Sequence, residues 1–115
     1  MNVCLHTFAY ENRSRVAIPF PSVAYDEEVY HPDLWWRGPM WPPVAYFMLE
    51  VLRAYGYESA YQEIAERLYT TMVRDGNLTE CYNSQTGAGM GCRQQGWTAA
   101  LVLHLNKHLR TNRRI

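Results

Sequence analysis

Glu80 is the residue whose type and setting most clearly suggest chemistry. It is the only acid in the stretch "LTECYNSQTGAGMGCRQQGWTAAL", residues 78–101, and the aromatic Tyr82 lies two residues after it. A lone glutamate in a loop is most often a solvated surface residue. This loop, however, is long and glycine-rich, and glycines let the backbone approach a ligand closely. We interpret Glu80 as a candidate functional carboxylate in a loop that can approach a ligand.

A second stretch, "WWRGPMWPP" at residues 35–43, combines three tryptophans with an arginine. Flat indole rings can stack on the faces of sugars, and a guanidinium can donate several hydrogen bonds to hydroxyls or to a carboxylate. The same residues could also form the packed entry to a helix, with Arg37 on the surface. The residue types leave both interpretations open.

Other kinds of site find less support in the sequence. His104 and His108 are one helical turn apart, but such a pair on a basic helix end is usually solvated. The "TGAGMG" stretch lacks the Lys-Ser/Thr pair of a phosphate-binding loop, and no serine has the context of a catalytic nucleophile. We therefore expect no metal and no cofactor.

The composition restricts the class of protein. The chain has 115 residues with eleven basic and eleven acidic side chains, so a broad basic face for nucleic acid is not expected. Three cysteines without C-x-x-C spacing suggest neither a zinc site nor a complete set of disulfides. We find no signal peptide and no apolar segment long enough for a membrane span. These features predict a single cytoplasmic domain over residues 1–115 that binds neither nucleic acid nor membrane.

The elements that must position these residues are mainly helical. Prolines interrupt residues 1–34, which we expect to be irregular, whereas residues 35–110 form the helical part. Start and stop signals predict helices over roughly 42–55, 59–74 and 97–109. The first two form an antiparallel hairpin, and a long loop over 76–95 precedes the third.

The apolar patterns predict which helix faces are buried. In the first helix the predicted buried stripe is Val44, Phe47, Met48, Val51, Leu52 and Tyr55. In the second, Ser59 and Gln62 are expected to form a capping box, and the buried stripe is Ala60, Ile64, Leu68 and Met72. The third helix is apolar around much of its circumference, which predicts burial on more than one side.

Four segments, taken in order, resemble the C-terminal part of glycoside hydrolase family 63. They span roughly residues 19–105 and read "PSVAYDEEVY", "WWRGPMWPPVAYFMLEVLRAYGY", "LTECYNSQTGAGMG" and "QGWTAALVL". The group includes processing α-glucosidase and bacterial mannosylglycerate and glucosylglycerate hydrolases. The resemblance implies an all-α fold of three or more helices that forms part of an (α/α)6 toroid, with the irregular segment and long loop described above.

The resemblance also implies a reaction and a set of site residues. Family members hydrolyse glycosides with inversion, using an acid and a base roughly 6.5–9.5 Å apart. By motif, Glu80 corresponds to the general base. The matching substrate-binding positions are Trp36, Arg37, Gly38, Trp41, Tyr82, Gln95 and Trp97. Cys81 departs from the pattern, because the family tends to carry a larger residue there. The residues near Gln95 also depart from it, because a Phe or similar residue is more usual near that position.

The family's general acid is an aspartate upstream of every matched segment, and none of Asp26, Asp33 and Asp75 lies in that motif. Without an acid the chain alone is expected to be inactive, because general acid catalysis commonly contributes ~10²–10⁴-fold. We therefore expect a truncated glycoside-hydrolase-like domain that binds a sugar or glycoside, or an enzyme whose acid another chain supplies. The alternative is a helical self-association or protein-interaction module, a homo-oligomer held by exposed apolar helix faces.

Overall fold

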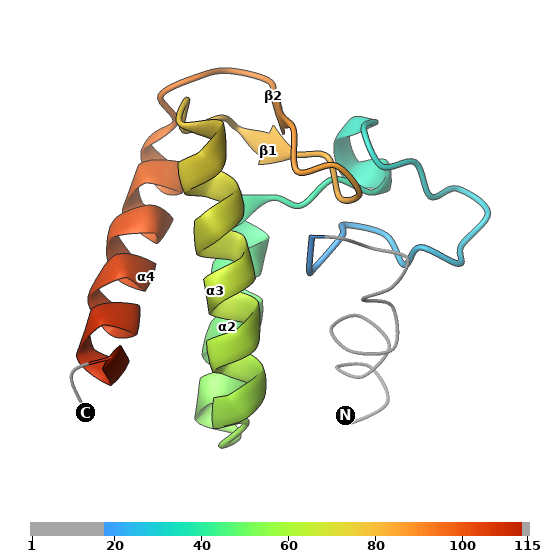
Figure 1. Cartoon of the computed structure of the whole chain (residues 1–115). Coiled ribbons are helices and arrows are strands. Elements are labelled where there is room, and N and C mark those ends of the chain that lie inside the picture. The colour runs from blue at the N-terminus through green and yellow to red at the C-terminus, as the bar shows by residue number, and fades with distance from the viewer. Residues whose placement is uncertain (1–17, 114–115) are drawn as a thin grey trace.

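The computed structural model describes residues 18–113, which contain three α-helices: α2 (Pro42–Ala54), α3 (Glu58–Asp75) and α4 (Gly96–Arg113). The helices pack together as a bundle, and the remaining described chain gathers near one end of it (Figure 1). The three predicted helices are confirmed, with bounds that differ by a few residues. All of the predicted helical part, residues 35–110, is described, whereas residues 1–17 of the expected irregular segment lie outside the described residues.

Local signals explain the α2–α3 hairpin. Pro42 and Pro43 occupy the first turn of α2, where a missing N–H costs little. Gly56 reverses the chain with a φ of 78°, and the Tyr57 N–H then donates to the Leu52 carbonyl oxygen at 2.9 Å. The predicted capping box at Ser59 is wrong. Because Gly56 and Tyr57 complete the turn, the helix already begins at Glu58, with Tyr57 as N-cap and no side-chain cap.

The core lies where α3 meets the other two helices. The predicted stripe of α3 is buried throughout, and Leu101, Leu105 and Leu109 of α4 are buried with it. Leu103, in contrast, is 69% exposed, so α4 buries one face in the described structure rather than several. The α3 stripe is confirmed because its apolar residues lie on a single side of an otherwise polar helix.

The predicted buried face of α2 is largely wrong. The helix buries Ala45, Leu49 and Leu52, whereas Phe47 is 67% exposed and Val44 is also exposed. Apolar residues cover most of the circumference of α2, so their spacing alone could not select the face that α3 and α4 cover. The consequence is an apolar surface on α2 that has no cover among the described residues.

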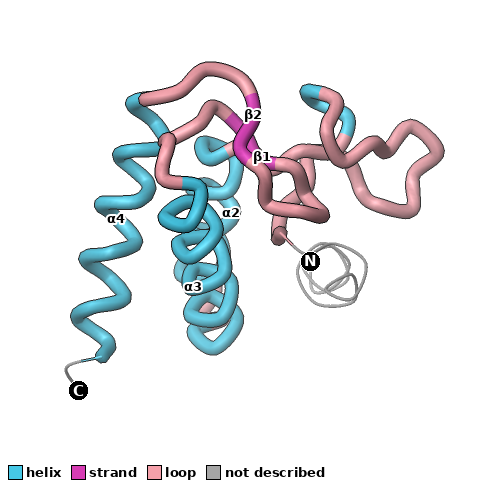
Figure 2. The backbone as a smooth tube through the Cα atoms, turned by 45° about the horizontal axis from the view of Figure 1, so that its top comes forward, coloured by secondary structure: helices cyan, strands magenta, loops and turns pink. Residues whose placement is uncertain are grey.

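The long loop before α4 contains a small β-hairpin that the sequence did not predict. Strands β1 (Cys81–Tyr82) and β2 (Gly89–Met90) pair in antiparallel register, with Cys81 opposite Met90 (Figure 2). Tyr82 also pairs with Met40, through hydrogen bonds of 2.8 and 2.9 Å between their backbones. Strands of two residues carry too little alternation to be recognised from sequence.

The connectivity brings three chain segments to one end of the bundle. Helix α3 runs antiparallel to α2 and α4, so the start of α2, the end of α3 and the start of α4 lie together (Figure 1). The short 3-10 helix η2 (Trp35–Arg37) and the hairpin lie near this end. Within residues 18–113, no helix has both the length and the apolar character that a membrane span requires.

Candidate functional site

Three tryptophans form a stack at the entry to α2. The indole of Trp41 lies 3.9 Å from that of Trp36, with an angle of 9° between their planes, and 5.8 Å from that of Trp35. Trp41 is only 3% exposed, whereas Trp35 and Trp36 are more than half exposed. Stacked aromatic pairs gain stability beyond their buried area. Trp35 and Trp36 therefore present apolar surface that Trp41 supports from beneath.

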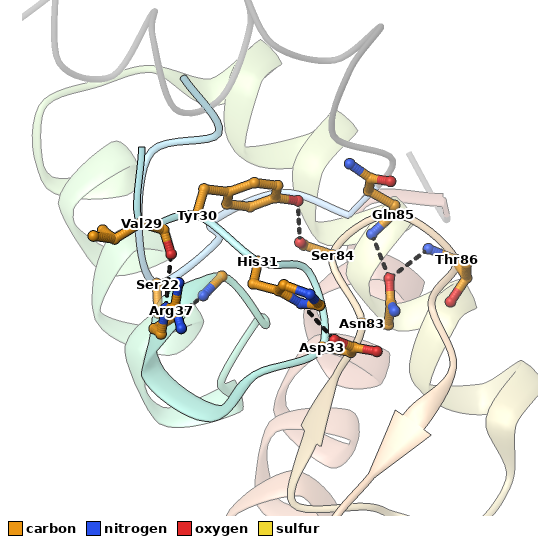
Figure 3. Close-up of polar contacts among 11 residues, drawn as sticks. Ser22, Val29, Tyr30, His31, Asp33, Arg37, Asn83, Ser84, Gln85 and Thr86 are labelled. Atoms are coloured by element: carbon orange, nitrogen blue, oxygen red, sulfur yellow. Dashed lines mark hydrogen bonds and ion pairs between the residues drawn. The ribbon is translucent and has the colours of Figure 1, made fainter. Parts of the chain in front are cut away.

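Hydrogen bonds and close packing hold the η2 turn that carries these rings. The Trp41 indole N–H donates to the Trp35 carbonyl oxygen at 2.9 Å, and Arg37 Nε donates to the Val29 carbonyl oxygen at 2.9 Å. The Gly38 N–H donates to Ser22 Oγ at 3.0 Å; Figure 3 shows this region. Gly38 is buried against the segment before η2, so its contribution is to let two stretches of backbone approach closely.

Trp97, at the start of α4, links the tryptophan stack to Glu80. Its ring packs edge-on against Trp41, with 6.4 Å between the centroids and 68° between the planes. Its indole N–H donates to the backbone carbonyl oxygen of Glu80 at 3.3 Å. The side chain is 42% exposed, so part of the ring stays open to solvent.

The Glu80 carboxylate is only partly buried and lies against the turn that follows β2. Its Oε2 atom accepts a hydrogen bond of 3.1 Å from the Cys92 backbone N–H. The Gly91 backbone passes beside the same carboxylate, so that a Cβ atom there would lie 2.5 Å from Oε2. The side chain therefore has a defined position beside the loop.

A cavity of about 290 Å³ lies beside this turn, lined by Asp33, Trp35, Cys81, Met90 and Gly91. The Asp33 carboxylate pairs with His31 Nδ1 at 2.6 Å (Figure 3). Asp33 and Met90 were not singled out from the sequence as site residues. Asp33 comes two residues before the tryptophan-rich segment, and this proximity is the one signal that could have identified it.

Two residues at the base of the site are buried. Tyr82 has no exposed surface, and burial raises the pKa of its phenol. Burial also raises the pKa of the Cys81 thiol to about 11, with a smaller contribution from the nearby charge of Glu80. Both groups therefore stay protonated at neutral pH and act in packing.

Left-handed backbone conformations occur on both sides of Glu80. Leu78 and Gln94 have φ values of 50° and 57°, and Trp35 in the stack has a φ of 33°. The Gln95 N–H donates to the Leu78 carbonyl oxygen at 2.8 Å, which joins the segment before Glu80 to the start of α4. Non-glycine residues with such angles are uncommon and often lie at functional sites.

The structure brings Glu80, Trp36, Trp41 and Trp97 together through a continuous series of contacts. Gly38, Trp41 and Tyr82 are buried, so they support the site and offer no open surface to a ligand. Gln95 contacts this region through its backbone, because its N–H donates to the Leu78 carbonyl oxygen. No hydrogen bond or ion pair links Arg37 to Glu80 in the part of the chain that the structure describes.

The described residues also contain no group of three or more His, Cys, Asp or Glu side chains arranged to hold a metal ion.

Comparison with known proteins identifies the family. The family model that describes the mannosylglycerate hydrolase MGH1-like glycoside hydrolase domain matches the sequence of residues 2–98. The mannosylglycerate hydrolase of Rubrobacter radiotolerans is 34% identical over 89 residues, covering 77% of this chain and 18% of that protein. The chain therefore spans about a fifth of the length of the curated relatives it matches.

Solved structures agree with this assignment. The family 63 mannosylglycerate hydrolase of Thermus thermophilus, in complex with Tris and D-glycerate, superposes with a TM-score of 0.82 at 29% identity. The match covers 90% of this chain and 25% of that one. The glucose complex of the same enzyme gives a TM-score of 0.79 at 28% identity, covering 89% and 26% of the two chains. The expected fold class is confirmed, and the chain belongs to the mannosylglycerate hydrolase MGH1-like glycoside hydrolase family.

Proposed function

We propose that this chain forms the sugar-binding and base-bearing part of an inverting glycoside hydrolase site, with Glu80 as the general base. The observation that carries this proposal is the contact between Trp97 and Glu80. One indole both packs on the tryptophan stack and donates to the backbone of the only acid in residues 78–101. Trp97 thus contacts both the aromatic surface proposed to bind the sugar and the residue whose carboxylate is proposed to act in hydrolysis.

Glu80 suits the role of base better than that of acid. A base must present an open carboxylate oxygen to the water molecule that attacks the sugar. Oε2 of Glu80 accepts the Cys92 N–H, and within residues 18–113 no group donates a hydrogen bond to Oε1. Inverting hydrolysis also needs an acid that protonates the leaving oxygen. We assign that acid to a part of the fold that corresponds to the rest of the relatives' length, so the chain alone is inactive.

The ligand class follows from the relatives. Proteins named mannosylglycerate hydrolase match this chain, and one solved relative holds D-glycerate while another structure of it holds glucose. A glycoside of glycerate, with either mannose or glucose, is therefore the first ligand to test. The half-exposed rings of Trp35 and Trp36 offer flat surfaces for the sugar, and the Arg37 guanidinium retains donors for the carboxylate or hydroxyls.

Isothermal titration calorimetry with mannosylglycerate, glucosylglycerate and trehalose tests the binding proposal. We expect saturable binding that Trp36→Ala weakens on the order of tenfold, because one aromatic contact is lost. Glu80→Gln tests whether the carboxylate contributes. The matched controls are Tyr55→Ala, an exposed ring at the opposite end of α2, and Glu58→Gln at the start of α3. Equal effects in site and control variants would contradict the proposal.

An apolar groove favours a second candidate function, self-association with another copy of this chain. The groove has a volume of about 360 Å³ and lies between α2 and α4. It is lined by Pro42, Pro43, Tyr46, Phe47, Trp97, Ala100, Leu101 and His104. Phe47 and Leu103 are each about two-thirds exposed, and apolar surfaces of this kind often mark interfaces.

The two candidates give different results in the same samples. Light scattering that shows a stable dimer, together with an absence of binding to all three glycosides, would favour the self-association module. A monomer that binds one of the glycosides would favour the glycosidase site. The homo-oligomer stays a prediction until that measurement is made.

A further inference from the structure

The Glu80 side chain and the Gly91 backbone are packed more closely than any other residue type at position 91 would allow. A Cβ atom built on Gly91 would lie 2.5 Å from Glu80 Oε2, 2.9 Å from its Cβ and 3.3 Å from its Cδ. A Cβ atom essentially never comes within 3.0 Å of a heavy atom that belongs neither to its own residue nor to the two adjacent residues. The contact involves the root of the Glu80 side chain as well as its tip, so rotation of the carboxylate alone would not relieve it.

Gly91 also has a φ of 79°, in the left-handed region that glycine adopts without cost. This angle turns the chain immediately after β2, and the next residue, Cys92, directs its N–H to Glu80 Oε2 at 3.1 Å. At the other end of the residue, the Glu80 carbonyl oxygen accepts the Trp97 indole N–H. Glu80 is therefore held at its backbone by one contact and at its carboxylate by another.

We propose that Gly91 is a positioning residue for Glu80: its missing side chain makes room for the carboxylate, and its turn aims the Cys92 N–H at one carboxylate oxygen. This inference rests on the proposed role of Glu80 as base. A base acts efficiently only when its orientation is fixed within narrow limits. With Oε2 held by the Cys92 N–H, Oε1 is the oxygen that faces the attacking water and receives its proton.

The chain offers a matched control for this proposal. Gly56, in the α2–α3 turn, has a φ of 78°, nearly the same as Gly91, but a Cβ atom built there meets nothing within 4 Å. Gly56→Ala and Gly91→Ala therefore place alanine at nearly the same left-handed φ, and only the second places an atom against Glu80. A difference between the two variants isolates the contact with the carboxylate.

The readout is the Cys92 backbone amide, followed by ¹H–¹⁵N NMR and hydrogen exchange. In the native chain and in Gly56→Ala, adding Glu80→Ala should shift this resonance and quicken exchange roughly tenfold, as expected when a hydrogen bond to a charged acceptor is lost. In Gly91→Ala, exchange should already be that fast, and adding Glu80→Ala should change little. A Cys92 amide that responds to Glu80→Ala as strongly in Gly91→Ala as in Gly56→Ala would overturn the proposal.

Folding of each variant is checked by the Trp97 indole N–H resonance, which reports the contact with the Glu80 backbone. If Gly91→Ala unfolds, Gly91→Asn and Gly56→Asn replace the alanine pair, because asparagine adopts left-handed angles more readily. The same variants are titrated with mannosylglycerate. If the native chain binds none of the glycosides, the proposed function fails even when the Cys92 result stands. If the native chain binds one of the glycosides but Gly91→Ala does not change the response of the Cys92 amide to Glu80→Ala, only the positioning inference fails.

Discussion

Gly38→Ala is expected to destabilise the tryptophan stack through a clash of known size. A Cβ atom at this position would lie 2.3 Å from the His31 carbonyl oxygen, 2.8 Å from its carbon and 2.9 Å from the Tyr30 ring. The φ of Gly38 is 166°, outside the left-handed region. The cost predicted here is that of the steric clash.

The clash cannot be relieved by a side-chain rotation, because two of the three contacted atoms belong to a backbone carbonyl group. To restore an ordinary contact of about 3.4 Å, the segment at His31 must move by about 1 Å relative to η2. That segment is held by a hydrogen bond of 2.7 Å from the His31 N–H to the Arg37 carbonyl oxygen. Overpacking of this kind typically costs about 1–3 kcal/mol.

Urea denaturation followed by tryptophan fluorescence measures the loss, and near-ultraviolet circular dichroism reports the coupling between the Trp36 and Trp41 rings, which are 3.9 Å apart. We expect a lower midpoint and a weaker tryptophan signal in Gly38→Ala. The control is Gly96→Ala, because a Cβ atom there meets nothing within 4 Å. Equal stability and equal dichroism in the two variants would refute the steric reasoning.

Two further predictions use ionisable groups. Burial lowers the pKa of His108, and His104 and Arg53 lower it further. Its neutral ring contacts Arg53 Nη1 at 3.2 Å. The unfolded chain therefore takes up this proton first as the pH falls below about 6.5, so stability should decrease there. Urea midpoints at pH 7.5 and 5.5 should differ less in His108→Gln. Burial raises the pKa of the Cys81 thiol to about 11, so iodoacetamide at pH 8 should label the exposed Cys92 and spare Cys81. Peptide mass spectrometry of the native chain checks this, and equal labelling would contradict it.

The positions of the helices could be predicted from sequence because their limits depend on local signals. Pro42 and Pro43 start α2, and Gly56 and Gly76 adopt left-handed angles just after α2 and α3. These preferences belong to the residues themselves and do not depend on distant contacts. The existence of each helix was therefore predicted correctly, although the first residue of α3 was not.

The buried face of α2 and the β-hairpin depend instead on contacts between distant residues. Phe47 is exposed and Ala45 is buried because of where α3 and α4 lie, which the spacing in α2 does not encode. The pairing of Met40 with Tyr82 joins positions 42 residues apart. The resemblance to a family identified Glu80 and the tryptophans together, whereas spacing alone left both a packing and a binding interpretation open.

The contacts that position Glu80, the base in our proposal, come from residues close to it in this chain. The Trp97 indole, the β-hairpin and the Gly91 turn all lie between residues 81 and 97, so the orientation of the carboxylate does not require the remaining four-fifths of the relatives' length. We propose no acid among residues 18–113. Asp33 lines the neighbouring cavity, but its carboxylate is already paired with His31 at 2.6 Å. Since an inverting enzyme needs its acid roughly 6.5–9.5 Å from the base, we expect hydrolysis only when another segment brings a free carboxyl group to the open side of Glu80.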